Sequence, residues 1–280
     1  MFGQLARRRT TTHAVNSRIF PTVRESARDL AFFLDVDGTL LELASRPDAV
    51  VVEGQTRDLL RDLVRASGGA VAFVSGRSIV TLDRLFQPIQ LPSAGLHGFE
   101  RRSASGEYFH CPVPPDEVLD QARTQLRALA ERFPGVLLED KQFALAIHYR
   151  QVPVFEPKLL QAVEEIARPL RESFEIQHGR LVIELRPRGS TKADAVAAFM
   201  RETPFRGRKP IFVGDDFTDE CAFAWVNAAE GYSVAVGVDR PSAARAHLPS
   251  VLAVHEWLRS LLTARASALR VEGATAESAQ

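Results

Sequence analysis

The chain has 280 residues, of which 45% are hydrophobic and 25% charged, as in a soluble globular protein of one large or two modest domains. The formal net charge is zero, and no apolar run is long enough to approach a membrane span. We therefore expect neither a nucleic-acid-binding surface nor a transmembrane anchor. Cys111 and Cys221 form neither a CxxC nor a metal-ligand spacing, which is typical of thiols in a reducing compartment. We therefore expect a cytoplasmic protein, and we take a monomer as the expected state.

Residues 1–28 are rich in Arg, Thr and Ser and lack sustained apolar periodicity, so we predict a flexible extension with a short helix near Val23–Leu30. Ala31–Leu34 is an apolar run that predicts a buried strand, and it ends abruptly in Asp-Val-Asp-Gly-Thr. Because side chains alternate along a strand, Asp35 and Asp37 leave it on the same side. Such carboxylates repel each other unless a cation or proton lies between them, and hard oxygen ligands suit Mg²⁺. The alternative is an ordinary polar turn.

Strands and helices then alternate. A helical pattern over Thr56–Ala66 leads to Val71–Arg77, a second apolar strand that ends in a polar loop with a glycine. Pro92–Glu100 is a third, weaker strand and turn. This alternation predicts a parallel sheet with right-handed crossovers, whose loops collect at the carboxyl ends of the strands.

The pattern changes after Cys111, where prolines indicate a stiff connection. Two helices, from Asp116 and over Leu159–Leu170, alternate with hairpins over 136–150 and 174–185, which predicts a small α+β domain of the form helix–hairpin–helix–hairpin. In the first hairpin apolar residues alternate with Ala144, Ala146, His148 and Arg150. We favour an exposed face for His148 and Arg150.

Pro187 marks the return to the first domain. Thr191–Arg201 is helical, with Lys192 in the first turn, where a cation opposes the helix dipole. Ile211–Gly214 is again an apolar strand that breaks into a loop of carboxylates, and Tyr232–Val238 is a further strand. Val251–Val254 and a helix over Glu256–Leu262 close the domain. We predict these boundaries: extension 1–28, core 29–111 and 188–264, inserted domain 112–187, and flexible tail 265–280.

Four polar clusters lie at strand ends or helix starts of the predicted sheet, on the side where open α/β sheets bind ligands. They are Asp35/Asp37, Ser75-Gly76-Arg77, Lys192 and Asp215/Asp216/Asp219.

In these clusters the chain resembles the haloacid dehalogenase-like (HAD) phosphohydrolases, whose four motifs match DxDGT, Ser75, Lys192 and GDDxTD in order. It is similar, more specifically, to the trehalose-6-phosphate phosphatases. The matching stretches are DVDGTL, SGR (75–77), GLHGFE (95–100), Glu139-x-Lys141, HYR (148–150), Ile183 to Pro187, and VGDDFTDE (213–220). The chain departs from the family at Val36, where an aromatic is usual, and at Ala193, where a glycine is usual; both departures leave room for a different substrate.

The resemblance implies an α/β fold, a Rossmann-like HAD core with a parallel sheet, into which 112–187 is inserted as a cap. It implies that Asp35 attacks phosphorus to form an aspartyl-phosphate and that Asp37 acts as general acid and base. Ser75 and Lys192 would bind the phosphoryl group. The resemblance implies Mg²⁺ as the cofactor, held by Asp35, the backbone carbonyl of Asp37, and Asp215. Asp219, and alternatively Asp216, would support it.

The resemblance also implies a sugar site. Glu139, Lys141 and Glu184 in the cap would read sugar hydroxyls, with Gly76, Arg77 and His97 contributing from the core. The alternative for the two glutamates is a solvated or salt-bridged strand residue. For His97 it is a loop residue that is merely hydrogen-bonded, and for Arg77 a contact that holds the Ser75 loop in place.

The expected function is Mg²⁺-dependent hydrolysis of trehalose 6-phosphate, in trehalose biosynthesis. The partner is then a small sugar phosphate rather than a nucleic acid or a membrane. The alternatives are a phosphatase of sucrose 6-phosphate or a glycosyl-phosphoglycerate, a phosphomutase, and a catalytically silent sugar-phosphate-binding regulatory protein.

Overall fold

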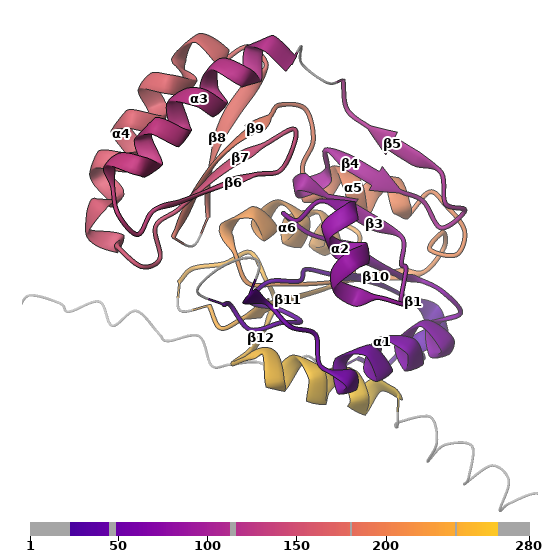
Figure 1. Cartoon of the computed structure of the whole chain (residues 1–280). Coiled ribbons are helices and arrows are strands. Elements are labelled where there is room, and N and C mark those ends of the chain that lie inside the picture. Colours follow the sequence, from indigo (N-terminus) through magenta and orange to yellow (C-terminus); the bar gives the residue numbers. More distant parts are fainter. Residues whose placement is uncertain (1–22, 45–48, 113–115, 180, 239, 263–280) are drawn as a thin grey trace, which may run out of the picture.

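The larger of two sheets is mainly parallel. The computed structural model describes residues 23–44, 49–112, 116–179, 181–238 and 240–262. Eight strands follow the order β12-β11-β10-β1-β2-β3-β4-β5 (Figure 1). All but the last two pairings are parallel, which confirms the predicted α/β core. The strands are β1 (Leu30–Leu34), β2 (Val71–Val74), β3 (Ser93–Gly95), β4 (Glu100–Arg102), β5 (Tyr108–His110), β10 (Lys209–Gly214), β11 (Tyr232–Val236) and β12 (Ala246–Leu248).

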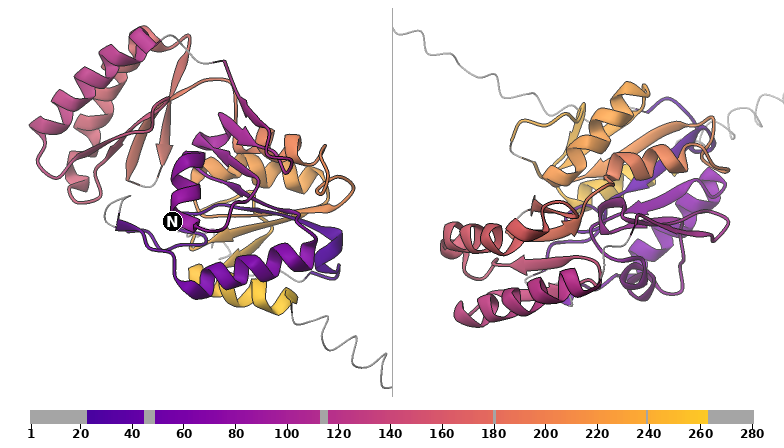
Figure 2. Two further views of the ribbon diagram at one scale, coloured as in Figure 1. Left: turned by 45° about the vertical axis from the view of Figure 1, so that its right-hand side comes forward. Right: turned by 90° about the horizontal axis from the view of Figure 1, so that it is seen from above.

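Helices cover both faces of this sheet (Figure 2). Side chains of β1 alternate between two cores: Phe32 packs with α1, α2 and the helix over 251–262, and Phe33 packs with α5 and α6. The Phe33 ring lies 5.4 Å from that of Phe205. The strand is therefore apolar at every position because both of its faces are buried. The named helices are α1 (Gly54–Ser67), α2 (Ile79–Phe86), α5 (Lys192–Phe199) and α6 (Glu220–Ala228).

The smaller sheet is antiparallel, with the order β6-β7-β9-β8. Helices α3 and α4 lie side by side on its outer face, and its other face is turned toward the larger sheet (Figures 1 and 2). The chain order is helix, hairpin, helix, hairpin, as predicted, and every strand lies within 112–187, although the exact domain boundaries stay a prediction. These elements are α3 (Asp116–Arg132), β6 (Leu137–Asp140), β7 (Leu145–His148), α4 (Glu156–Ala167), β8 (Phe174–Gly179) and β9 (Val182–Pro187).

The centre of the larger sheet is a switch point. From β1 the chain proceeds to β2 on one side, and it returns through β10 on the other. Residues Asp35, Ser75 and Asp215 directly follow β1, β2 and β10, so the parallel register brings their loops to one edge. Ligands of open α/β sheets bind at such a point.

Several expectations differ from the structure. The helix expected near Val23–Leu30 is only a 3₁₀ turn, Ala27–Asp29, because Leu30 already pairs with Lys209 in the sheet. Residues 23–28, assigned to a flexible extension, pack on the core: Glu25 bonds Lys209 at 2.8 Å and Ala27 is buried. Residues 1–22 and 263–280 lie outside the described residues. The antiparallel pair β4–β5 was not predicted, and the last helix spans 251–262 as one segment.

Candidate active site

A buried ammonium lies at the floor of the site. Lys192 is the first residue of α5, whose start is fixed by a reciprocal capping box between Thr191 and Asp194. Its Nζ donates to Asp35 Oδ1 at 2.9 Å and to Asp219 Oδ1 at 2.6 Å. Burial alone would lower the pKa of Lys192, but the two carboxylates outweigh it and raise that pKa. A charged lysine, unfavourable at a helix start, is therefore held in place by the site.

Three carboxylates converge beside this lysine. One oxygen from each of Asp35, Asp215 and Asp219 lies within 4.8 Å of the other two. Burial raises the pKa of Asp35 and Asp215, and the charge of Asp219 adds to both effects. Gly38, at φ +79°, makes the approach possible, because a Cβ there would lie 2.1 Å from Asp215 Oδ2. Clustered hard oxygen donors with a shortage of positive charge fit a divalent cation such as Mg²⁺.

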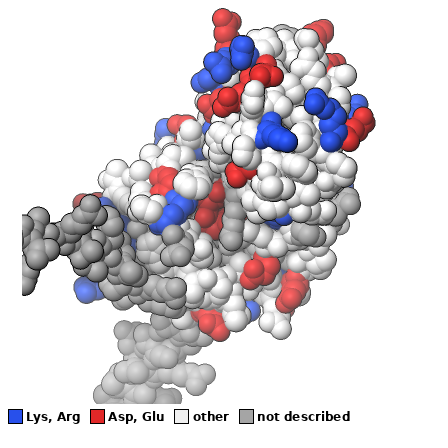
Figure 3. All heavy atoms as spheres, turned by 90° about the vertical axis from the view of Figure 1, so that its left-hand side faces the viewer, with Lys and Arg blue, Asp and Glu red and all other residues white. Residues whose placement is uncertain are grey.

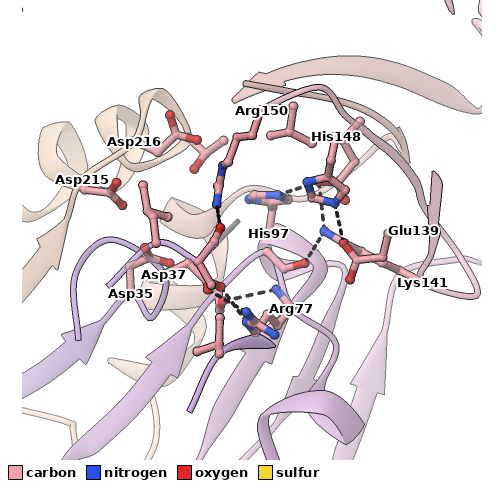
Figure 4. A pocket seen from close by; sticks show the side chains of 18 of the residues that line it. Asp35, Asp37, Arg77, His97, Glu139, Lys141, His148, Arg150, Asp215 and Asp216 are labelled. Carbon is pink, nitrogen blue, oxygen red and sulfur yellow. Dashed lines mark hydrogen bonds and ion pairs between the residues drawn. The ribbon is translucent and has the colours of Figure 1, made fainter. Parts of the chain in front are cut away.

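The second aspartate of the motif is paired with an arginine. Arg77 donates from Nε and Nη2 to the two oxygens of Asp37, at 2.6 and 2.7 Å (Figure 4). The N–H of Arg77 also donates to Ser75 Oγ, at 3.2 Å. Arg77 therefore connects the loop after β2 to the carboxylate after β1, whether or not it also binds substrate.

The cap places two charged side chains on the core. Lys141 donates from Nζ to the carbonyl of Gly76 at 2.8 Å, and the same nitrogen lies 3.2 Å from Glu184 Oε2. That carboxylate oxygen is also 3.2 Å from His97 Nε2. Burial alone would raise the pKa of Glu184, but Lys141 and His97 outweigh it and lower that pKa. Glu184 is therefore a buried carboxylate that stays ionised.

His148 and Arg150 also lie in the site, so the expectation of an exposed face for them was wrong. His148 Nε2 is 2.7 Å from Glu139 Oε2, and Arg150 hydrogen-bonds the carbonyl of Ala44 in the core. The sequence contained an indication that this face is covered. The face also carries Ala144 and Ala146, which are buried, and such small residues suit a face against which another part of the protein packs. The apolar face of β7 packs instead on α3 and α4.

One cavity between cap and core unites these groups, and Figure 3 shows acidic side chains gathered in a hollow between the two parts of the molecule. Thr218, which sequence reasoning missed, also lines it with a buried hydroxyl that has no partner among the described residues. Asp219 alone of the predicted site residues is absent from the lining, because it lies fully buried beneath Lys192. The predicted lining residues are Asp35, Asp37, Ser75, Gly76, Arg77, His97, Glu139, Lys141, Glu184, Lys192 and Asp215, with Asp216 beside them.

Solved structures of other proteins share this fold. The fold matches the C-terminal domain of Candida albicans trehalose-6-phosphate phosphatase with a TM-score of 0.75 and 22% identity, over 84% of this chain and 93% of that one. It also matches a HAD-superfamily phosphatase from Bacteroides thetaiotaomicron with a TM-score of 0.57 and 17% identity, over 86% and 98% of the two chains.

Sequence comparison identifies the family to which the chain belongs. A family model described as trehalose-phosphatase matches residues 33–251. The trehalose-6-phosphate phosphatase of Escherichia coli K12 is 42% identical over 240 residues, 86% of this chain and 89% of that protein. A probable trehalose-phosphate phosphatase of Sinorhizobium fredii is 42% identical over 237 residues, 84% and 87% of the two chains. The chain belongs to the trehalose-phosphatase family.

Proposed function

We propose that this protein hydrolyses trehalose 6-phosphate to trehalose and phosphate, with Mg²⁺ as cofactor. The observation that carries the proposal is a single cavity with two chemically different ends. Asp35 and Lys192 form one end, and Lys141 and Glu184 of the cap form the other. A phosphoryl group needs the first set, and a hydroxyl-rich leaving group needs the second.

The chemistry proceeds in two steps at Asp35. A carboxylate oxygen of Asp35 forms a bond to phosphorus while the bond from phosphorus to the sugar oxygen breaks, and Asp37 gives that oxygen a proton. Water then attacks phosphorus, Asp37 takes its proton, and the aspartyl–phosphorus bond breaks to release phosphate. Lys192 and Ser75 bind the phosphoryl oxygens. In the structure the two carboxylate oxygens of Asp37 accept hydrogen bonds from Arg77.

The carboxylate cluster supplies the residues for the cation. Asp35 and Asp215 would hold Mg²⁺, and Asp219 would keep Lys192 and the loop before α6 in place, through bonds to Lys192 Nζ and to the N–H of Asp216. When bound, the cation neutralises charge on the phosphoryl oxygens and on the attacking carboxylate. Its absence would leave unfavourable negative charge on Asp35, which is buried, and on Asp215, which is half-buried.

Phosphate release from a panel of sugar phosphates tests the function. We expect kcat/KM for trehalose 6-phosphate to exceed that for sucrose 6-phosphate, glucose 6-phosphate and a glycosyl-phosphoglycerate by about 100-fold or more, because the cap groups must pair with a matching set of hydroxyls. EDTA is expected to abolish release and added Mg²⁺ to restore it.

Each outcome of the panel has a distinct meaning. A preference for another sugar phosphate would keep the phosphatase and replace the substrate, and an EDTA-insensitive rate would contradict the cation site. Binding of a sugar phosphate without turnover would favour a regulatory protein, and transfer of phosphate to a second position of the sugar would favour a mutase.

The pH dependence of stability tests the cation site independently of activity. Burial raises the pKa of Asp35 from 3.8 to about 7 and that of Asp215 from 3.8 to about 9 in the metal-free protein. Their contribution to folding stability is thus full below pH 3.8 and is lost as the pH rises through the folded values. Mg²⁺ removes the penalty, so the Mg²⁺-induced increase in Tm is expected to be several degrees larger at pH 8.0 than at about pH 5.5.

Asp215→Asn is the matched control for this experiment. It removes a ligand and a titrating group together, so its Tm is expected to respond little to Mg²⁺ at either pH. An equal Mg²⁺ response of the unmodified protein at both pH values would contradict the link between these carboxylates and the cation.

The setting of the enzyme follows from fewer observations. Among the described residues, none of the helices is both long and apolar enough to cross a membrane. All the site residues come from one chain, so a monomer carries a whole site. The monomeric state and the cytoplasmic location stay predictions.

A further inference from the structure

His97 is carried by an unusual turn. Leu96 and His97 have φ values of 50° and 58°, in the left-handed region that residues other than glycine rarely adopt. Gly98 follows at φ 104°, and a Cβ there would lie 2.5 Å from the carbonyl oxygen of Thr191. Backbone in this region persists only where its surroundings hold it, and it is concentrated at functional sites.

The loop after β2 holds this turn. The N–H of His97 donates to the carbonyl of Ser75 at 2.9 Å, and the N–H of Leu96 donates to the carbonyl of Arg77 at 3.1 Å. The imidazole lies against Gly76, where a Cβ would be 2.7 Å from Nε2. The position of the ring is therefore set by the same loop that supplies Ser75.

The cap contacts the core at the His97 ring and at Gly76. Gly76 accepts a hydrogen bond from Lys141 through its carbonyl, and the ring meets Glu184 through Nε2. His97 and Glu184 are nearly inaccessible, with 10% and 5% of their side chains exposed. The contact can exist only while the cap lies against the core, as it does in Figure 4.

The proton of the imidazole can be assigned. Burial lowers the pKa of His97, so the ring is neutral near pH 7 and carries one proton. Glu184 is ionised and can only accept, which places the proton on Nε2. Nδ1 has no partner among the described residues and carries no proton in this tautomer. The second oxygen of Glu184, Oε1, is buried and also has no partner among the described residues.

We propose that His97 is a positioning residue for sugar recognition: its Nε2–H holds Glu184 Oε2 when the cap is closed and leaves Oε1 to accept a sugar hydroxyl. This inference rests on the proposed function and deepens it. With the cap open, Glu184 loses this donor and the sugar site is incomplete. A small phosphate ester has no sugar to present, so its hydrolysis does not depend on the His97–Glu184 contact.

The test compares kcat/KM for trehalose 6-phosphate and for p-nitrophenyl phosphate in His97→Ala, His97→Asn and His97→Gln. The Gln amide reaches the place of Nε2 and can donate to Glu184, whereas the Asn amide ends near Nδ1. We expect Ala and Asn to lose about 10- to 100-fold on trehalose 6-phosphate and less than about threefold on the small ester. Gln is expected to recover most of that loss. His178→Ala, at an exposed histidine in the cap, is the matched control and is expected to change neither value.

The outcomes separate the two proposals. Equal losses on both esters, or a Gln variant no better than Ala, would overturn the positioning role of His97. If the unmodified protein prefers a different sugar phosphate in the panel, the proposed substrate is wrong. The variants are then compared by kcat/KM for that sugar phosphate relative to kcat/KM for p-nitrophenyl phosphate. Far-UV circular dichroism and Tm establish that each variant is folded. If His97→Ala does not fold, His97→Gln keeps the test decisive.

Discussion

Replacement of Asp35 by asparagine is expected to lower kcat/KM for trehalose 6-phosphate by about 10⁴-fold or more, because an amide cannot form the covalent bond to phosphorus. The residue follows directly from β1 and is nearly buried, so no other described carboxylate is placed to substitute for it without moving the loop. Asp215 is on the neighbouring strand end, and Asp37 is engaged by Arg77. Phosphate release under saturating Mg²⁺ measures the loss.

The same variant should fold. Burial raises the pKa of Asp35, so a charge at this place disfavours the metal-free native state, and asparagine removes it. The amide oxygen can still accept the hydrogen bond from Lys192. The Tm of Asp35→Asn in EDTA is therefore expected to equal or exceed that of the unmodified protein.

The matched control is Asp58→Asn, the same change at an exposed helix position whose partner is Arg61. It is expected to leave both rate and Tm unchanged. Substantial turnover by Asp35→Asn would eliminate the aspartyl-phosphate step, and a collapse of its Tm would attribute the lost rate to unfolding.

The core of the site was predictable because it depends on local rules. An apolar strand followed by a polar loop occurs at β1, β2 and β10, and parallel pairing necessarily brings the ends of such strands together. The order of the motifs predicted that Asp35, Ser75, Lys192 and Asp215 lie together, and these four residues line one cavity. Lys192 was recognisable even by its electrostatic cost, since a cation at a helix start requires a nearby anion.

The remaining features of the site depend on how the cap and the core pack against each other. Alternation along β7 predicted which side chains share a face but not which face is covered, so His148 and Arg150 were placed in solvent. The left-handed backbone at Leu96 has no signal in residue type, because tertiary contacts enforce it against local preference. The short pair β4–β5 was missed because each strand has only three residues, too few for a clear alternation.

Glu184→Ala is expected to lower kcat/KM for trehalose 6-phosphate by about 10- to 100-fold, and to change the value for p-nitrophenyl phosphate by less than about threefold. Among the described residues, Lys141 and His97 contact one oxygen of this carboxylate and nothing contacts the other. Its loss therefore removes a sugar acceptor and leaves these two donors without it. Lys141 keeps the carbonyl of Gly76, which limits the damage to the cap.

The ratio of kcat/KM for trehalose 6-phosphate to kcat/KM for p-nitrophenyl phosphate, rather than either value alone, identifies the role of Glu184. A residue that only stabilised the closed cap would slow both esters, since water exclusion and the position of Gly76 serve the phosphoryl end for every substrate. A residue that reads sugar slows only the substrate that has one. Glu164→Ala, an exposed glutamate on α4 of the same cap, supplies the matched control and is expected to leave the ratio unchanged. Equal losses on both esters would therefore assign Glu184 to closure and move the recognition of the sugar to Glu139 and His148.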